Sequence, residues 1–265
     1  MTIPDSFYLP PAFSLAGKKG LVIGIANEHS IAWGCAKVMH SLGADLAVTW
    51  LNERAEPFVH PLARALGSTI ALPCDVEQPG QLEAVFAAIE RDWGRLDFAL
   101  HAVAFAPAAD LHGRVIDCSA VGFARAMDVS CHSFLRMAKL AEPLMTSGGT
   151  LLTMSYYGAQ KVVGLYNLMG PVKAALEAAM RELATELGPQ GIRVHAVSPG
   201  PIQTRAASGI AHFDVMLDES AQRSPEQRLV TIEDVGMAAA TLVSDWSRGM
   251  TGNVVFVDGG SHVLA

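Results

Sequence analysis

The sequence predicts a doubly wound α/β fold on one parallel sheet of seven strands, and three observations support this prediction. Short apolar runs alternate along the chain with longer amphipathic stretches that have the period of helices. The apolar runs are rich in Val, Ile and Leu and do not alternate with polar residues, as in strands buried on both faces. The 265 residues are 51% hydrophobic and contain no repeat or linker, which favours a single domain over residues 1–265.

Each apolar run is interpreted as one strand, and each amphipathic stretch as one crossover helix. The expected strands are 20–25, 46–51, 69–74, 98–104, 150–155, 192–198 and 253–258. The expected helices are one that starts at Ser30 or Ile31 and those at 81–91, 123–145, 172–187 and 232–243. The stretch after the sixth strand is too long for an ordinary connection, which predicts a substrate-binding lid over approximately residues 202–228.

Composition and charge exclude several classes of function. The chain has 19 basic and 26 acidic residues and no run of Lys or Arg, which argues against a nucleic-acid or membrane surface. The first residues lack the basic start and apolar core of a signal peptide. The uncharged stretch 143–160 is broken by Gly, Ser and Thr, so it is not expected to span a membrane. The 4 cysteines and 9 histidines have no metal-ligand spacing, so we expect free thiols, no metal and a cytoplasmic protein.

The turn after the first strand has features of a dinucleotide site. Gly24 ends the strand, Gly34 closes the turn region, and Ser30 and Ile31 stand at the expected helix start. A glycine there lets the backbone approach a pyrophosphate, and the helix N–H groups can bind its oxygens. The common GxGxxG pattern is replaced by a longer spacing of Gly24-x9-Gly34.

The ends of the third and second strands add two further signals. Asp75 can accept from an adenine amino group while Val76 packs against the ring, although Asp75 can equally cap the helix that follows. After the second strand, Glu53 could bind ribose hydroxyls and Arg54 could meet a 2′-phosphate, which leaves NADH and NADPH both open.

The stretch SYYGAQKVVGLYNLMGPVK contains two tyrosine–lysine pairs that could serve in catalysis. Tyr157 and Lys161 lie among glycines in poor helical sequence, so their side chains are not expected on one helical face. A serine about twelve residues earlier, the usual companion of that spacing, is also absent. We therefore reject this pair.

The second pair, Tyr166 and Lys173, is joined to a strong amphipathic helix. Asn167 can cap that helix, and Pro171 falls in its first turn, where a missing N–H costs nothing. Seven residues make close to two helical turns, which predicts that both side chains point to the same side. Tyr156 approaches the same cleft from the fifth strand.

Five segments together resemble the type I enoyl-acyl-carrier-protein reductases, a divergent group of short-chain dehydrogenase/reductases. They are GIANEHSIAWG, CDV, SYYGAQKVVGLYNLMGPVKAALEA, VSPGPIQTRAASGI and VTIEDVG, and the likeness covers about residues 14 to 262. The resemblance implies a Rossmann-like fold and the reduction of the trans-2 double bond of an enoyl thioester. It also implies NAD as cofactor (NADP not excluded), an acyl-carrier protein with an enoyl chain as partner, and a homotetramer.

The family's functional residues are carried over by position. Its catalytic residues fall on Tyr166, Lys173 and Tyr156. Its nucleotide contacts fall on Gly24, Ser30, Ile31, Leu51, Asp75, Val76, Val103, Lys173, Ile202, Thr204 and Ala206. Its substrate contacts fall on Ala106 and Tyr156, and the apolar residues Phe213 and Met216 of the expected lid are added to them.

This chain departs from the family pattern beside the expected nicotinamide. Ala102 and Ala104 stand where the family usually has Ser and Gly, Leu51 replaces a common glutamine, and Arg205 replaces a common leucine. Two rivals therefore stay open: a carbonyl or alcohol oxidoreductase that uses Tyr157 and Lys161, and a nucleotide-binding protein without catalysis. The acyl length and the choice between acyl-carrier protein and coenzyme A are also open.

Overall fold

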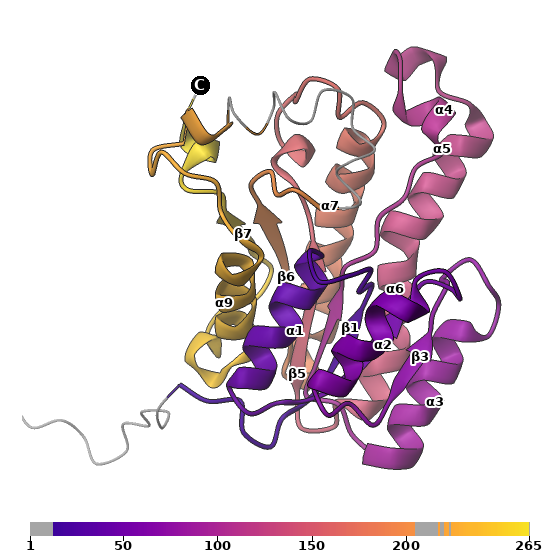
Figure 1. The fold of residues 1–265 in the computed structure, drawn as a ribbon, viewed down its shortest axis with the longest axis vertical. Helices are drawn as coiled ribbons and strands as arrows, with labels where there is room; N and C mark the ends of the chain where they lie inside the picture. The colour runs from indigo at the N-terminus through magenta and orange to yellow at the C-terminus, as the bar shows by residue number, and fades with distance from the viewer. Residues whose placement is uncertain (1–12, 205–216, 218–219, 223, 265) are drawn as a thin grey trace, which may run out of the picture.

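The computed structural model describes residues 13–204 and 224–264, together with 217 and 220–222 (Figure 1). Its centre is a seven-stranded sheet with the order β3-β2-β1-β4-β5-β6-β7. All six pairings between neighbouring strands are parallel. The strands are β1 (Lys19–Ile23), β2 (Asp45–Trp50), β3 (Ala71–Pro73), β4 (Phe98–His101), β5 (Gly149–Met154), β6 (Ile192–Pro199) and β7 (Val254–Val257). The predicted doubly wound parallel sheet is confirmed, and each expected strand is found.

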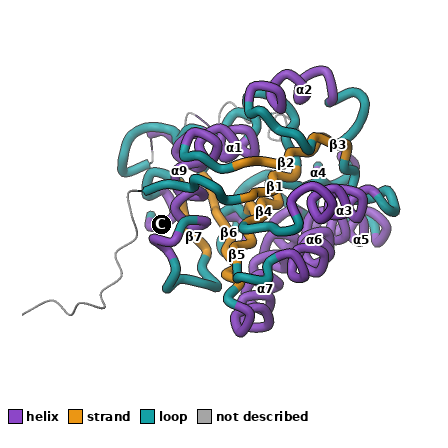
Figure 2. Tube along the Cα trace, turned by 90° about the horizontal axis from the view of Figure 1, so that it is seen from below, coloured by secondary structure: helices purple, strands orange, loops and turns teal. Residues whose placement is uncertain are grey.

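Helices cover both faces of the sheet (Figure 2). One face carries α1 (Ile31–Ser41), α2 (Glu56–Ala65) and α9 (Ile232–Val243). The other carries α3 (Gln81–Trp93), α6 (Ser133–Ala141) and α7 (Met169–Leu187), with α5 (Ala120–Met127) before α6. Shorter elements are α4 (Ala108–Leu111), η1 (Val115–Asp117), η3 (Glu142–Leu144), η4 (Tyr157–Ala159), η5 (Gly188–Gln190), η7 (Asp245–Ser247) and η8 (Ser261–Val263). Each face has its own apolar core, which explains why the strands are apolar on both sides.

The first and last long helices, α1 and α9, pack against each other with little space between their backbones. A Cβ at Gly34 would overlap the carbonyl of Ile232, and a Cβ at Gly236 would overlap the carbonyl of Gly34. Gly34 therefore lies inside α1 and serves helix packing, which corrects its expected place at the end of the nucleotide turn. At the start of α9, Thr231 and Asp234 form a capping box.

One helix was not predicted, and another was predicted with the wrong extent. The helix α2, between β2 and β3, was not among the expected helices, and it has a proline in its first turn and Pro61 inside. The stretch 123–145 was expected to be one helix, but it is divided into α5, a π-helical turn η2 (Asp128–His132), α6 and η3. Serine hydroxyls compete with the helical ladder there, because Ser133 Oγ donates to Val129 O at 2.6 Å.

Candidate active site

The carboxyl ends of the central strands meet at one edge of the sheet. Ile23 of β1 pairs with His101 of β4, which pairs with Thr153 of β5, which pairs with Ala196 of β6. The strand order reverses direction at β1 and β4, and doubly wound sheets bind ligands in the crevice at such a point. The loops that leave this edge therefore build the candidate site.

Gly24 follows β1 in a conformation that favours glycine. Its φ is +102°, and an added Cβ would overlap the carbonyl oxygen of Ala102 while lying 3.5 Å from Val103 Cγ2. The backbone N–H of Gly24 donates to Thr49 Oγ1 at 3.3 Å. The glycine therefore lets the loops after β1 and β4 lie in contact, and Val103 borders it as expected.

The amino end of α1 has no side-chain cap. Ser30 occupies the N-cap position, but its hydroxyl donates to Asn27 O at 2.7 Å instead of capping the helix. Ile31 is the first helical residue, as predicted. The first-turn N–H groups of such a helix, together with its dipole, form a site for an anion such as a pyrophosphate.

The Asp75 carboxylate organises its own loop rather than the following helix. Its Oδ1 accepts from Glu77 N at 3.0 Å, and the Asp75 N–H donates to Gln81 Oε1 at 2.8 Å. The N-cap of α3 is Gly80, so the alternative role of Asp75 as a helix cap was wrong. Val76 is buried in the core next to this loop.

The loop after β4 is fastened to the π-helical turn by one hydroxyl. Ser130 Oγ accepts from Phe105 N at 2.9 Å and donates to Phe105 O at 3.0 Å. Ala106 follows directly and packs with Tyr166 in a small apolar cluster. Sequence reasoning missed Ser130, because a serine inside a predicted helix gives no signal that it binds a distant loop.

Tyr156 and Tyr166 form the most direct contact between predicted catalytic side chains. Their ring centroids lie 4.6 Å apart, with 59° between the ring planes. A Cβ at Gly158 would overlap the Tyr166 ring, so this glycine leaves the space that the ring fills. Burial raises the pKa of Tyr156 to about 12, and burial with the nearby Tyr156 raises the pKa of Tyr166 still further. Both phenols are therefore hydrogen-bond donors near neutral pH.

Tyr166 does not lie on the helix with Lys173, contrary to the two-turn argument. It stands in a turn before α7, between Leu165 and Asn167, which have φ of +65° and +43°. Asn167 does not cap α7 either, since its side-chain amide donates to Leu111 O at 2.9 Å and the N-cap is Leu168. Left-handed backbone at non-glycine residues is unusual and was not visible in the sequence.

Lys173 is buried at 4% exposure on the inner face of α7. Its Nζ donates to the carbonyl of Met154, the last residue of β5, at 2.6 Å. Burial lowers the pKa of Lys173 to about 8, while the nearby Cys131 and Glu177 act in the opposite direction. The lysine therefore holds its charge at neutral pH and loses it in mildly alkaline solution.

Tyr157 and Lys161 do not share a helix, as predicted. Tyr157 begins the short turn η4, which ends at Ala159, and Lys161 lies beyond it in irregular backbone. The Tyr157 ring packs edge-on against Phe256 with centroids 6.2 Å apart. No continuous helix over the described residues 157–161 places the two side chains on one face.

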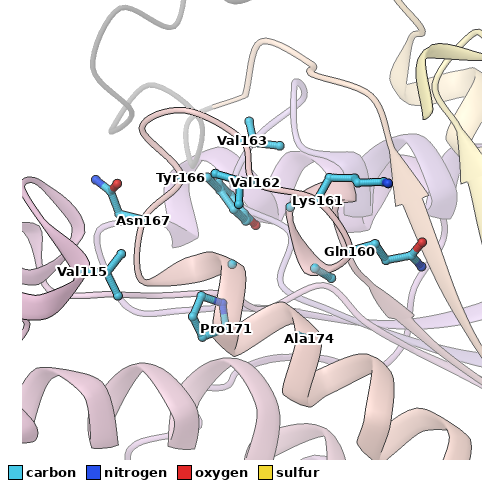
Figure 3. Close-up of a pocket in the computed structure, with 12 residues that line it drawn as sticks. Val115, Gln160, Lys161, Val162, Val163, Tyr166, Asn167, Pro171 and Ala174 are labelled. Atoms are coloured by element: carbon cyan, nitrogen blue, oxygen red, sulfur yellow. The ribbon is translucent and has the colours of Figure 1, made fainter. Parts of the chain in front are cut away.

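A cavity of about 410 Å³ borders Tyr166 (Figure 3). Its lining comes from Val115, from the segment 158–163, and from Asn167, Gly170, Pro171 and Ala174 around the start of α7. Tyr166 therefore contacts this cavity on one side and the ring of Tyr156 on another.

The remaining predicted contacts lie at the rim or outside the described part of the chain. Leu51 is 53% exposed after β2, and Ile202 is partly buried against the core. Thr204 is the last described residue before the gap. Ala206, Phe213, Met216 and most of the expected lid 202–228 lie outside the described residues.

The residues present fit a nicotinamide dinucleotide. The loop at Gly24 has no room for a side chain, and the α1 amino end leaves N–H groups for phosphate oxygens. The buried ammonium of Lys173 lies at the same sheet edge and can donate to ribose hydroxyls. Among the described residues, no group of three His, Cys, Asp or Glu could hold a metal, and no helix is long and apolar enough to cross a membrane.

The chain is similar to known proteins over most of its length. A family model described as enoyl-(acyl carrier protein) reductase matches residues 24–262. An enoyl-acyl-carrier-protein reductase (NADH) 1 of Rhizobium meliloti is 48% identical over 248 residues, which cover 94% of this chain and 91% of that protein. An enoyl-acyl-carrier-protein reductase (NADH) of Salmonella typhimurium is 45% identical over 252 residues, which cover 95% and 96%.

Solved structures agree with these similarities. The reductase of Anaplasma phagocytophilum in complex with NAD has a TM-score of 0.91 at 49% identity, covering 95% of this chain and 96% of that chain. The Bacillus cereus reductase, with NADP+ and indole naphthyridinone, has a TM-score of 0.92 at 43% identity, covering 95% and 98%.

Proposed function

This chain belongs to the enoyl-(acyl carrier protein) reductase family, and from that premise we propose that it reduces the trans-2 double bond of enoyl thioesters in fatty-acid synthesis. NADH is the hydride donor, because the Rhizobium meliloti and Salmonella typhimurium relatives carry NADH in their names. The observation that carries this function is the contact between the Tyr156 and Tyr166 rings at the sheet edge where Lys173 binds the end of β5.

The dinucleotide is held by the loops at the carboxyl edge. The α1 amino end at Ser30 and Ile31 binds the pyrophosphate, and Gly24 lets the backbone approach it. The adenosine half is assigned to the loops after the strands, which carry Leu51, Asp75, Val76 and Val103. The segment with Ile202 and Thr204 is proposed to complete the site, together with Ala206, which lies outside the described residues. Bound there, the reduced nicotinamide supplies a hydride to the β-carbon of the thioester.

Tyr166 and Lys173 stabilise the charge that this reduction creates. Hydride addition to the β-carbon leaves an enolate whose negative charge resides largely on the thioester oxygen. The Tyr166 phenol keeps its proton because its pKa is raised by burial, so it can donate a hydrogen bond to that oxygen. The Lys173 ammonium binds ribose hydroxyls and adds positive charge nearby. Protonation of the α-carbon then completes the reaction.

Tyr156 and Ala106 lie on the substrate side of this arrangement. Tyr156 contacts the Tyr166 ring directly, and Ala106 packs in the same cluster as Tyr166. A thioester held between them would place its oxygen near both phenols. Phe213 and Met216 are proposed to contact the acyl chain, and this stays a prediction because they lie outside the described residues.

The partner and assembly are finer proposals. We expect the acyl chain to arrive on an acyl-carrier protein and the enzyme to form a homotetramer. Val121 and Phe123 of α5 are 80% and 44% exposed, and such apolar side chains could be covered by a second subunit. Light scattering should give about four times the 28.0 kDa of one chain, and the mass of one chain at micromolar concentration would contradict this.

The four free cysteines agree with the proposed cytoplasmic location.

The test of function follows NADH absorbance with trans-2-enoyl thioesters of several chain lengths, on coenzyme A and on acyl-carrier protein. We expect turnover with enoyl thioesters and little with a β-ketoacyl thioester or a simple ketone. Preference for the ketone would support the rival carbonyl reductase. Nucleotide binding without turnover of any substrate would support the non-catalytic alternative.

A further inference from the structure

Glu177 places a buried carboxylate beside the proposed catalytic groups. It lies on α7 one helical turn after Lys173 and is 3% exposed. Its Oε1 accepts from Ser155 Oγ at 2.6 Å, and its Oε2 accepts from Gln160 Nε2 at 3.1 Å. Both oxygens therefore act as acceptors, which is the role of an ionised carboxylate.

The two donors bracket the segment that carries Tyr156. Ser155 directly precedes this tyrosine, and Gln160 follows the short turn η4. One residue before Ser155, the carbonyl of Met154 accepts from Lys173 Nζ at 2.6 Å. The helix α7 therefore binds Met154 at the end of β5 through Lys173, and it binds Ser155 and Gln160 in the following loop through Glu177.

The segment 155–160, between these two hydrogen bonds, contains one of the two phenols and contacts the other. Hydrogen bonds to an ionised carboxylate are roughly twice as strong as neutral ones, and breaking them leaves a buried charge without partners. Gly158 lies within the bracket, and its missing side chain leaves the space for the Tyr166 ring. Because the two rings are in contact at 4.6 Å, a shift of residues 155–160 would move both tyrosines relative to Lys173.

We propose that Glu177 is a positioning residue: it holds the segment 155–160 through Ser155 and Gln160, so that Tyr156 and Tyr166 stay aligned with Lys173. This inference rests on the proposed function, in which these three side chains serve the reduction. Glu177 is buried and both of its oxygens accept hydrogen bonds from protein donors, so it acts through the two residues that it binds.

The same carboxylate also acts on the charge of Lys173. Two titratable groups raise the pKa of this lysine, Cys131 from η2 and Glu177 on α7 itself, while the charge of Lys173 lowers the pKa of the nearby His101 on β4. Burial lowers the pKa of His101 to about 3 and raises the pKa of Cys131, so both are neutral near pH 7. Glu177 raises the pKa of Lys173 against the effect of burial. Its loss should therefore make the ammonium lose its proton at lower pH.

The test compares Glu177→Gln with the unmodified enzyme and with Glu182→Gln, a matched change on the exposed face of α7. We expect Glu177→Gln to lower kcat by about 10- to 100-fold, the scale of a misplaced catalytic group, with a smaller change in KM for NADH. The alkaline limb of the kcat profile should move to lower pH. Glu182→Gln should leave kcat, KM and the limb unchanged.

A second variant separates positioning from charge and guards against a folding defect. Gln160→Met removes one donor at an exposed residue and keeps the Glu177 charge, so kcat should fall several-fold while the alkaline limb stays in place. Normal kcat and an unmoved limb in Glu177→Gln would overturn the proposal, as would normal kcat in Gln160→Met. If the unmodified enzyme reduces no enoyl thioester, the proposed function fails; if it does and these variants match it, only the role of Glu177 fails.

Discussion

The candidate site has two halves, one around Gly24 and α1 and one around β5 and α7, and they use different chemical groups. Around Gly24 and the start of α1 the structure offers backbone N–H groups, a residue without a side chain and no side-chain cap. Around β5 and α7 it offers two half-buried phenols in ring contact, together with a buried ammonium and a buried carboxylate that are held by specific hydrogen bonds. We therefore expect added atoms in the first half to weaken NADH binding, and the removal of a single polar group in the second half to lower kcat.

The largest expected effect comes from deleting one hydroxyl in the second half. Tyr166→Phe should lower kcat by roughly 10- to 1,000-fold, because it removes one donor to the enolate oxygen. Tyr157→Phe is the matched control, since the Tyr157 ring packs against Phe256 away from the Tyr166 pair, and its effect should be small. Steady-state kinetics with crotonyl-coenzyme A gives both values. Equal losses, or a greater loss at Tyr157, would show that the catalytic tyrosine is misassigned.

Adding one methyl group tests the first half. Gly24→Ala should weaken NADH binding by about tenfold or more, because it combines strain at positive φ with overlap on the Ala102 carbonyl. Gly67→Ala provides the control, since Gly67 also has a positive φ of +60° but no atom lies within 4 Å of the added Cβ. Calorimetry of NADH binding compares the two. Equal NADH affinity in both variants would remove Gly24 from the nucleotide site.

The pH dependence of kcat tests the second half, because Tyr156, Tyr166 and Lys173 in that half all have shifted pKa values. Lys173 loses its proton as pH rises through about 8, so kcat should fall above that value, by up to about tenfold per pH unit. Lys173→Ala should also weaken NADH binding, because the ammonium serves the ribose as well. A flat kcat between pH 7 and about 9.5 would contradict a catalytic ammonium with this pKa.

The last prediction concerns the stability of the folded chain around His101, which is buried in the second half. His101 is buried, with Nε2 2.7 Å from Ser133 Oγ and Nδ1 3.2 Å from Thr153 Oγ1, and burial lowers its pKa to about 3. Between pH 6.5 and about 3, His101 binds a proton in the unfolded chain but not in the folded protein. The free energy of unfolding should therefore fall by about 1.4 kcal/mol per pH unit from this group as pH drops toward about 3.

Urea unfolding at several pH values measures this slope. His101→Asn should reduce the slope, whatever its effect at neutral pH, whereas the same change at the exposed His40 should leave it unaltered. An unchanged slope in His101→Asn would mean that other groups, such as the buried His195, account for the loss of stability in acid.

The sheet was predictable because buried parallel strands are continuous apolar runs, and their ends differ from expectation by only a few residues. Helices were harder to predict. The prolines of α2 concealed it, although its first-turn proline costs nothing. The π-helical turn was not predictable, because the sequence gives no signal that Ser130 Oγ binds the backbone of Phe105 or that Ser133 Oγ donates to Val129 O.

In the candidate site, it was easier to predict which side chains lie at one edge of the sheet than how the backbone holds them. Tyr156, Tyr166 and Lys173 lie at the same sheet edge, yet Tyr166 is held by a left-handed turn and not by the helix. Glu177 had a usable signal, since it is an acid one turn after Lys173 on the buried face of an amphipathic helix. Its partners Ser155 and Gln160 could not be inferred, because the loop that brings them together has no regular period.

The contact between α1 and α9 has a consequence for the order of synthesis. The helix α1, which is proposed to bind the pyrophosphate, is made early, but the surface at Gly34 against which Ile232 and Gly236 pack stays uncovered until residues 232–243 have left the ribosome. Contacts between residues so distant along the chain form late in folding. A nascent chain that ends after β6 should therefore hold α1 loosely, and if α1 binds the pyrophosphate as proposed, NADH should bind only once α9 has been added.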